Sequence, residues 1–176
     1  HLNFEAFHDV YLHHNERVWA MYRKGTMAKE ELRTARFSRS FDDLNFSYTA
    51  EWMEQFASAF VDQCPRQPHL IPGALELLSH LEGRYQMHII TNGFKEVQHI
   101  KLREAGLKPF FDVIVCSEEV GVNKPNPIVF QHSMEKAGAK KEKSVMIGDD
   151  YQVDYLGALS AGMKAVFFNH KGEKKI

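Results

Sequence analysis

The sequence has little cysteine, almost no net charge and no long apolar run, and each absence excludes a class of protein. Its 176 residues carry 22 basic and 23 acidic side chains, so we expect no global attraction to a nucleic-acid polymer or an anionic membrane. We find no secretory signal and no apolar stretch long enough to span a bilayer. Of the two cysteines, Cys64 and Cys116, the second lies in an apolar run and is expected in the core. A globular cytoplasmic protein is predicted.

The apolar pattern changes near the prolines of residues 65–68. Before them the pattern is helical, and after them short strand patterns alternate with helical ones. That alternation is the order of a doubly wound parallel sheet of the α/β class. We therefore expect a small α-helical domain at residues 1–69 and an α/β core at residues 70–176. The expected helices of the first domain cover residues 4–25, 28–39 and 49–62.

Clustered carboxylates behind one strand pattern are the most informative feature. The apolar run 144–147 ends in Gly148, and Asp149 follows at once. Open α/β sheets bind ligands at the carboxyl ends of their strands, and Asp154, in the first turns of the next helix, can point at the same spot. Two carboxylates suit a hard cation such as Mg²⁺. Alternatively, Asp149 and Asp150 merely cap that helix, and the spacing alone favours neither interpretation.

A second polar group follows an earlier strand pattern. Residues 87–90 read as a short strand, and Thr91, Asn92 and Gly93 come directly after it. A hydroxyl, an amide and a glycine with an approachable backbone make a small anion cradle, which the N-terminus of a helix over residues 95–105 would support. The alternative is an ordinary strand-to-helix turn.

A lysine follows the strand pattern that lies between these two. Residues 113–116 read as a strand, and the polar loop 117–123 leads to Lys124 and Pro125. The proline forces an extended backbone on Lys124 and so fixes where its side chain starts. A lone Lys-Pro pair is usually no more than a solvated surface feature. Three polar features at three successive strand ends, however, favour one shared site.

These features resemble the second, third and fourth motifs of the haloacid dehalogenase-like (HAD) hydrolase superfamily. The resemblance covers residues 70–169, roughly, and implies the HAD-like core fold. It also implies that Thr91, Asn92 and Gly93 bind the transferring phosphoryl group. Lys124 would neutralise that group and the nucleophile, so Thr91 and Lys124 would be catalytic residues.

The same resemblance assigns the carboxylates. Asp149 would bind Mg²⁺, and Asp154 would support the metal or orient Lys124. These residue types fit the chemistry, because phosphoryl transfer is catalysed mainly by positioning and by cancelling charge on the phosphoryl oxygens.

The first motif of the family, Asp-x-Asp-x-Thr/Val after an N-terminal strand, is absent from this sequence. Asp42 and Asp43 come closest, but they lie between helical patterns and look like turn residues. We therefore expect the sequence to be a fragment, with the nucleophilic and acid/base aspartates upstream of it. Because the missing strand is central in the family's sheet, two inner strand edges should be left unpaired.

The N-terminal helices resemble the C1-type cap of this superfamily, which closes over the active site and selects the substrate. Asn15, Trp19, Tyr22 and the pair Arg36-Phe37 resemble the cap of the subgroup that dephosphorylates noncanonical pyrimidine nucleotides. This implies that the aromatic rings stack on a base, that Asn15 hydrogen-bonds its edge and that Arg36 meets a charged group. The alternative is that the aromatic residues only pack the core.

The resemblance implies a Mg²⁺-dependent phosphatase that forms a phospho-aspartate. The substrate would be a small phosphorylated metabolite, with a nucleoside 5′-monophosphate as the first candidate. A haloacid dehalogenase is disfavoured, since such enzymes need no Mg²⁺ and carry Ser and Asn where this chain has Gly148 and Asp149. A sugar-phosphate phosphatase or phosphomutase stays open, as does a non-catalytic fragment that binds without turnover.

Overall fold

The computed structural model describes residues 2–170 and residue 172. The chain forms two compact units, His1–Arg66 and Gln67–Ile176, called below the helical unit and the α/β unit. Within the described residues, no helix is both long and apolar enough to cross a membrane.

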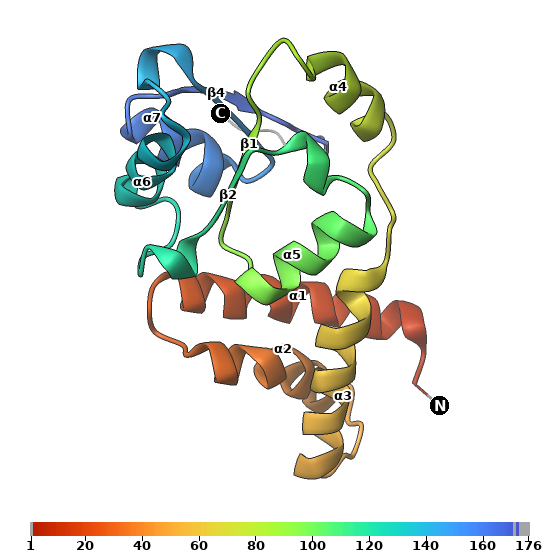
Figure 1. Cartoon of the computed structure of the whole chain (residues 1–176). Helices are drawn as coiled ribbons and strands as arrows, with labels where there is room; N and C mark the ends of the chain where they lie inside the picture. The colour runs from red at the N-terminus through yellow and green to blue at the C-terminus, as the bar shows by residue number, and fades with distance from the viewer. Residues whose placement is uncertain (1, 171, 173–176) are drawn as a thin grey trace. The chain divides into compact units, whose positions relative to one another are not determined.

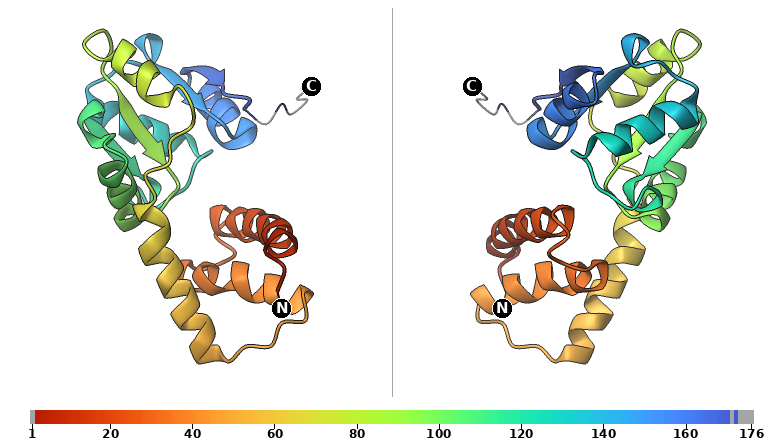
Figure 2. Two further views of the ribbon diagram at one scale, coloured as in Figure 1. Left: turned by 90° about the vertical axis from the view of Figure 1, so that its right-hand side faces the viewer. Right: turned by 90° about the vertical axis from the view of Figure 1, so that its left-hand side faces the viewer.

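The helical unit consists of α1 (Phe4–Arg23), α2 (Lys29–Asp43) and α3 (Ala50–Gln63), followed by the 3₁₀ turn η1 (Cys64–Arg66). Figure 2 shows the three helices separately, with a loop joining α2 to α3. The predicted second helix ended at residue 39, but α2 continues to Asp43. The extra turn buries the Phe41 side chain, which is only 2% exposed, and this burial stabilises the longer helix.

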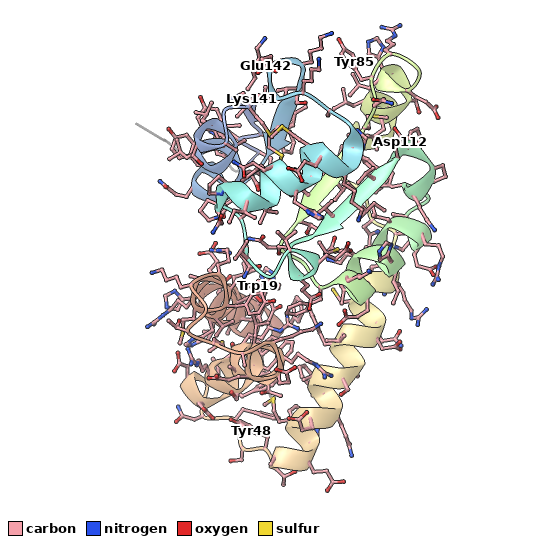
Figure 3. The ribbon with its side chains drawn as sticks, turned by 60° about the vertical axis from the view of Figure 1, so that its left-hand side comes forward. Trp19, Tyr48, Tyr85, Asp112, Lys141 and Glu142 are labelled. Carbon is pink, nitrogen blue, oxygen red and sulfur yellow. The ribbon has the colours of Figure 1, made fainter. Side chains whose placement is uncertain are left out.

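Aromatic rings form the core of the helical unit. Phe37 and Phe41 on α2 pack with Met53 and Ala57 on α3. The rings of Phe7 and Tyr11 on α1, and of Tyr48, Phe56 and Phe60, surround this cluster. In Figure 3, Trp19 and Tyr48 lie at opposite ends of this unit.

A polar pair ties α1 to the end of α2 within the same unit. The buried His14 ring places Nε2 2.7 Å from Asp43 Oδ2. His14 is therefore a structural residue of this unit.

The α/β unit alternates helices with short parallel strands. After α4 (Ala74–Leu81), β1 pairs in parallel with β2, and further along the chain β3 pairs in parallel with β4. Helix α6 packs on β1 and β2 and also contacts α7 (Figure 1). The strands are β1 (His88–Thr91), β2 (Val113–Cys116), β3 (Val145–Gly148) and β4 (Lys164–Phe167), and the remaining helices are α5 (Lys95–Glu104), α6 (Pro127–Ala137) and α7 (Gly157–Ser160).

Short helical turns complete the unit. They are η2 (Lys108–Phe110), η3 (Ser117–Glu119), η4 (Lys141–Lys143) and η5 (Tyr151–Leu156). The first three are 3₁₀ turns, whereas η5 is a π-helix. The sequence predicted an ordinary helix there. Short π-helical segments occur often at functional sites.

The predicted α/β class is correct, but within the described residues the four strands form two separate pairs instead of one sheet. The Met87 carbonyl accepts a hydrogen bond from Asp112, next to β2. Because carbonyls alternate in direction along a strand, the Ile90 carbonyl faces away from β2.

One apolar cluster joins the two strand pairs. Phe130, Ala158 and Met163 are buried in it, and Ile90 of β1 and Met146 of β3 pack against them. The other face of β3 and β4 exposes aliphatic side chains: Val145, Ile147 and Val166 are each about half exposed. The α/β unit is thus well packed on one side of the β3–β4 pair and exposed on the other.

Candidate active site

Of the polar residues predicted from the sequence, Asn92, Lys124 and Asp154 are joined by hydrogen bonds where β1 and β3 end. Thr91 and Gly148 are the last residues of these strands. Lys124, from the loop after β2, reaches the end of β1, and Asp154, from η5, reaches Lys124. The ends of three different strands therefore contribute to one cluster of side chains.

Lys124 is the centre of this cluster. Its side chain is buried, and Nζ donates to Asp154 Oδ1 at 2.6 Å and to the Ile90 carbonyl at 2.8 Å. A buried ammonium group is tolerated when it has such partners. The lysine also binds the Ile90 carbonyl, which pairs with no neighbouring strand within the described residues. Its charge is thereby fixed beside the end of β1.

Asp154 is engaged through both of its carboxylate oxygens. Oδ1 accepts from Lys124, and Oδ2 accepts from the Asp150 amide at 3.3 Å. A methyl group on Gly148 would overlap the Asp154 side chain, so only glycine allows this close approach. Of the two roles that the sequence left open for Asp154, these contacts favour orienting Lys124 over binding a metal.

Asp149 and Asp150 differ in their surroundings. Asp150 Oδ1 accepts from the Gln152 and Val153 amides at 3.0 and 2.9 Å, so Asp150 caps η5. The side chain of Asp149 is 61% exposed, with Oδ2 3.6 Å from His170 Nε2. The capping alternative thus applies to Asp150, while the Asp149 carboxylate remains accessible to a cation.

A tight turn follows β1. Thr91 Oγ1 accepts from the Gly93 amide at 3.0 Å, so the Thr91 hydroxyl proton can still be donated to a ligand. A methyl group on Gly93 would overlap the Gln98 amide. The Lys95 amide at the start of α5 donates to Glu118 Oε2 at 2.8 Å. A protein carboxylate therefore already binds at the helix N-terminus that was expected to support the anion cradle.

Asn92, predicted to bind phosphate, directs its side chain to the backbone of Lys124. Oδ1 accepts from the Lys124 amide at 2.8 Å, and Nδ2 donates to the Lys124 carbonyl at 3.0 Å. The preceding loop residue is also held, because Ser117 Oγ donates to Asn123 Oδ1 at 2.8 Å. Side chains thus fix the position of the Lys124 loop from two sides.

In the helical unit, Tyr11 links two of the predicted substrate residues. Its hydroxyl donates to Asn15 Oδ1 at 3.4 Å. The Arg36 guanidinium lies 4.9 and 4.8 Å from the ring centres of Phe37 and Phe60. Burial lowers the pKa of Arg36, and the nearby Tyr11 partly offsets this effect. The Arg36 Nε atom is buried without a hydrogen-bond partner in the described residues.

The other two predicted substrate residues, Trp19 and Tyr22, contact each other. Their ring centres are 5.7 Å apart, with the planes nearly perpendicular. Both are half-buried. This geometry is compatible with stacking on a ligand and with simple packing.

The sequence interpretation missed several residues that shape the site. Tyr11 lies four residues before Asn15, so the helical spacing could have revealed that pair. Glu118 gave no such signal, because the fold brings the Lys95 amide to it.

Comparison with known proteins decides the family. Residues 8–168 match the family described as haloacid dehalogenase-like hydrolase. The chain belongs to this family. The predicted HAD-like hydrolase identity is therefore confirmed.

Two relatives in this family are named as nucleotidases. Pyrimidine 5′-nucleotidase YjjG of Escherichia coli (strain K12) is 35% identical over 156 residues, which cover 88% of this chain and 67% of that protein. Pyrimidine 5′-nucleotidase PynA of Streptococcus pneumoniae (strain ATCC BAA-255 / R6) is 30% identical over 169 residues, covering 95% and 70%.

A solved HAD-hydrolase structure shares the fold. The magnesium-bound crystal structure of the putative HAD-hydrolase YfnB from Bacillus subtilis superposes with a TM-score of 0.84 at 29% identity. The match covers 96% of this chain and 74% of that one. The structure of that protein reveals interdomain movement.

Proposed function

We propose that the protein is a Mg²⁺-dependent HAD phosphatase that acts on a small phosphorylated metabolite through a phospho-aspartate. The observation that carries the proposal is the buried Lys124 ammonium, held by Asp154 and the Ile90 carbonyl at the end of β1. A fixed cation at the end of β1 suits a transferring phosphoryl group, whose oxygens carry the negative charge.

The described residues hold no group of three or more His, Cys, Asp or Glu side chains that could bind a metal ion, so the proposed Mg²⁺ would have fewer protein ligands. This ion commonly binds one or two carboxylates and completes its octahedron with water and substrate phosphate oxygens. Asp149, the residue that follows β3, supplies an accessible carboxylate, and we assign the metal to it. When bound, Mg²⁺ would neutralise phosphoryl oxygens. Both oxygens of Asp154 are already bonded, so we propose that Asp154 orients Lys124.

The proposed phospho-aspartate needs a nucleophilic carboxylate. Asp150 and Asp154 are used for capping η5 and for holding Lys124. We therefore propose that neither of them is the nucleophile.

We further propose a nucleoside 5′-monophosphate as the substrate. Support comes from the two relatives named as pyrimidine 5′-nucleotidases and from the polar group of Asn15, Tyr11 and Arg36 in the helical unit. An amide and a guanidinium held among aromatic rings suit a planar base with polar edges. Asn15, Trp19, Tyr22 and Arg36 are the proposed substrate residues.

The test measures phosphate release from a panel of nucleoside 5′-monophosphates and sugar phosphates, with Mg²⁺ and with EDTA. We expect Mg²⁺-dependent turnover, highest on a nucleotide. Asp149→Asn should raise the Mg²⁺ concentration needed for activity and lower kcat by at least about 10²-fold. Full activity in Asp149→Asn would contradict the metal assignment. Preference for a sugar phosphate would contradict the substrate class alone.

A further inference from the structure

We propose that the Asn92 side chain is a positioning residue that sets the place of Lys124 by binding its backbone. The expected effect of Asn92 on catalysis rests on the proposed function, whereas its expected effect on the Lys124 backbone does not. It gives Asn92 a role different from direct phosphate binding through its side chain.

The two hydrogen bonds define the geometry. Oδ1 of Asn92 accepts from the Lys124 amide at 2.8 Å, and Nδ2 donates to the Lys124 carbonyl at 3.0 Å. The partners are a fixed donor and a fixed acceptor, so only one orientation of the carboxamide satisfies both. One side chain thereby mimics the pairing of a neighbouring strand. It connects residues 32 positions apart in the chain.

Both ends of the lysine are then fixed at the same strand. Asn92, the residue after β1, holds the Lys124 backbone, while the Ile90 carbonyl of β1 accepts from Lys124 Nζ. The long, flexible lysine stem is thus anchored at its base and at its tip. Loss of the base anchor should let the loop move, and a displacement near 1 Å of a catalytic group can cost about 10²-fold in rate.

The loop has no equivalent anchor that would make Asn92 redundant among the described contacts of Lys124. Ser117 holds Asn123, one residue earlier, through side chains. Asn126, two residues later, accepts from the Ile128 amide and caps α6. Asn126 is therefore a matched control: it is the same residue type in the same loop, and the one hydrogen bond described for its side chain goes to Ile128 and not to Lys124.

The first experiment is independent of catalysis. Amide hydrogen exchange at Lys124, measured by NMR, is compared in the wild type, Asn92→Ala and Asn126→Ala. We expect the Lys124 amide to exchange at least about tenfold faster in Asn92→Ala, because its acceptor is gone, and to be unchanged in Asn126→Ala. Unchanged exchange in Asn92→Ala would overturn the proposal.

The second experiment is a double-mutant cycle on kcat with a phosphate ester. Asn92→Ala alone should lower kcat by roughly 10- to 100-fold with little change in KM. In the Lys124→Ala background the same substitution should cost nothing further, since Asn92 acts through Lys124. A rise in KM with kcat retained, or additive losses, would overturn the proposal in favour of direct substrate contact.

A second variant covers the case in which Asn92→Ala does not fold. Asn92→Asp keeps the size and the acceptor for the Lys124 amide but cannot donate to the Lys124 carbonyl. It should show the same kcat loss and the same coupling to Lys124→Ala. If the wild type releases no phosphate from any ester, the proposed function fails, and the exchange experiment still decides whether Asn92 holds Lys124.

Discussion

The two units differ in the side chains at the centre of their buried interiors. The helical unit has a core of aromatic rings centred on Phe37 and Phe41, whereas the α/β unit has an ion pair, Lys124 with Asp154, among its buried groups. Rings stabilise through the apolar area that they bury and through close packing, so the loss of a ring leaves a cavity. A buried pair stabilises only while both partners stay in place. The comparison predicts that the α/β unit is more sensitive to a single change of charge, and the helical unit to a loss of volume.

Removing the charge of Asp154 should have the largest effect on stability. Asp154→Asn leaves the buried Lys124 ammonium without its carboxylate, which should lower the free energy of unfolding by about 3–5 kcal/mol. The measurement is urea denaturation. The control is Lys136→Met, which breaks a solvent-accessible pair with Glu119 and should cost about 0–1 kcal/mol. Equal losses in the two variants would contradict the distinction between a buried and an exposed pair.

Removing a central ring is the corresponding test of the helical unit. Phe37 is 1% exposed, so Phe37→Ala should cost about 3–4 kcal/mol through lost burial and a cavity. Hydrogen exchange should locate the loss in α1 to α3. As a control, Phe4→Ala removes a ring that is 74% exposed and should stay within about 0.5 kcal/mol. If Phe37→Ala lowered protection from exchange equally in both units, the predicted difference between the units would be wrong.

A smaller effect is expected where the strand end meets the ion pair. Gly148→Ala puts a methyl group into the space of the Asp154 side chain, which should cost about 1–3 kcal/mol and lower kcat by displacing Lys124. Thermal unfolding and phosphate release would measure the two effects. Val145→Ala on the same strand is the control, because Val145 is 52% exposed. Wild-type activity in Gly148→Ala would show that Asp154 need not approach the strand so closely.

The reactivity of the two cysteines compares the units without a change in the sequence. Burial, with the nearby Glu119 and Glu118, raises the pKa of Cys116 in the α/β unit to about 11. Its thiol should stay protonated, and slow to alkylate, until the pH rises above about 10. Cys64 in the helical unit is half-buried and should react first. Mass spectrometry after iodoacetamide treatment at pH 8 would record the order, and prior modification of Cys116 would refute it.

Local features of the site could be predicted because they depend on residues that are adjacent in the sequence. The strand ends behind Thr91 and Asp149, and the loop before Lys124, followed from apolar runs and the residues next to them. The family resemblance, now confirmed, added the order of the motifs. The extra turn of α2 was missed, since it depends on the burial of Phe41 by other helices.

Contacts between distant residues could not be predicted in this way. No local pattern links Asn92 to Lys124, or Glu118 to the amide of Lys95, because the fold alone brings them together. The π-helical form of η5 was also missed. Its sequence gives the same helical pattern as an ordinary helix, and the difference lies in contacts that Asp150 and Asp154 make in the folded site.

The bond from Lys124 to the Ile90 carbonyl has a consequence for the timing of entropy loss. A free lysine side chain explores many rotamers, and restricting it costs about 2 kcal/mol. In this protein the side-chain entropy is lost when the chain folds, because the ammonium group is already bound to the strand and to Asp154. A ligand that arrives at the end of β1 meets a charge already confined to one position. The loss of side-chain freedom is therefore incurred once per folded molecule and not again with each ligand bound.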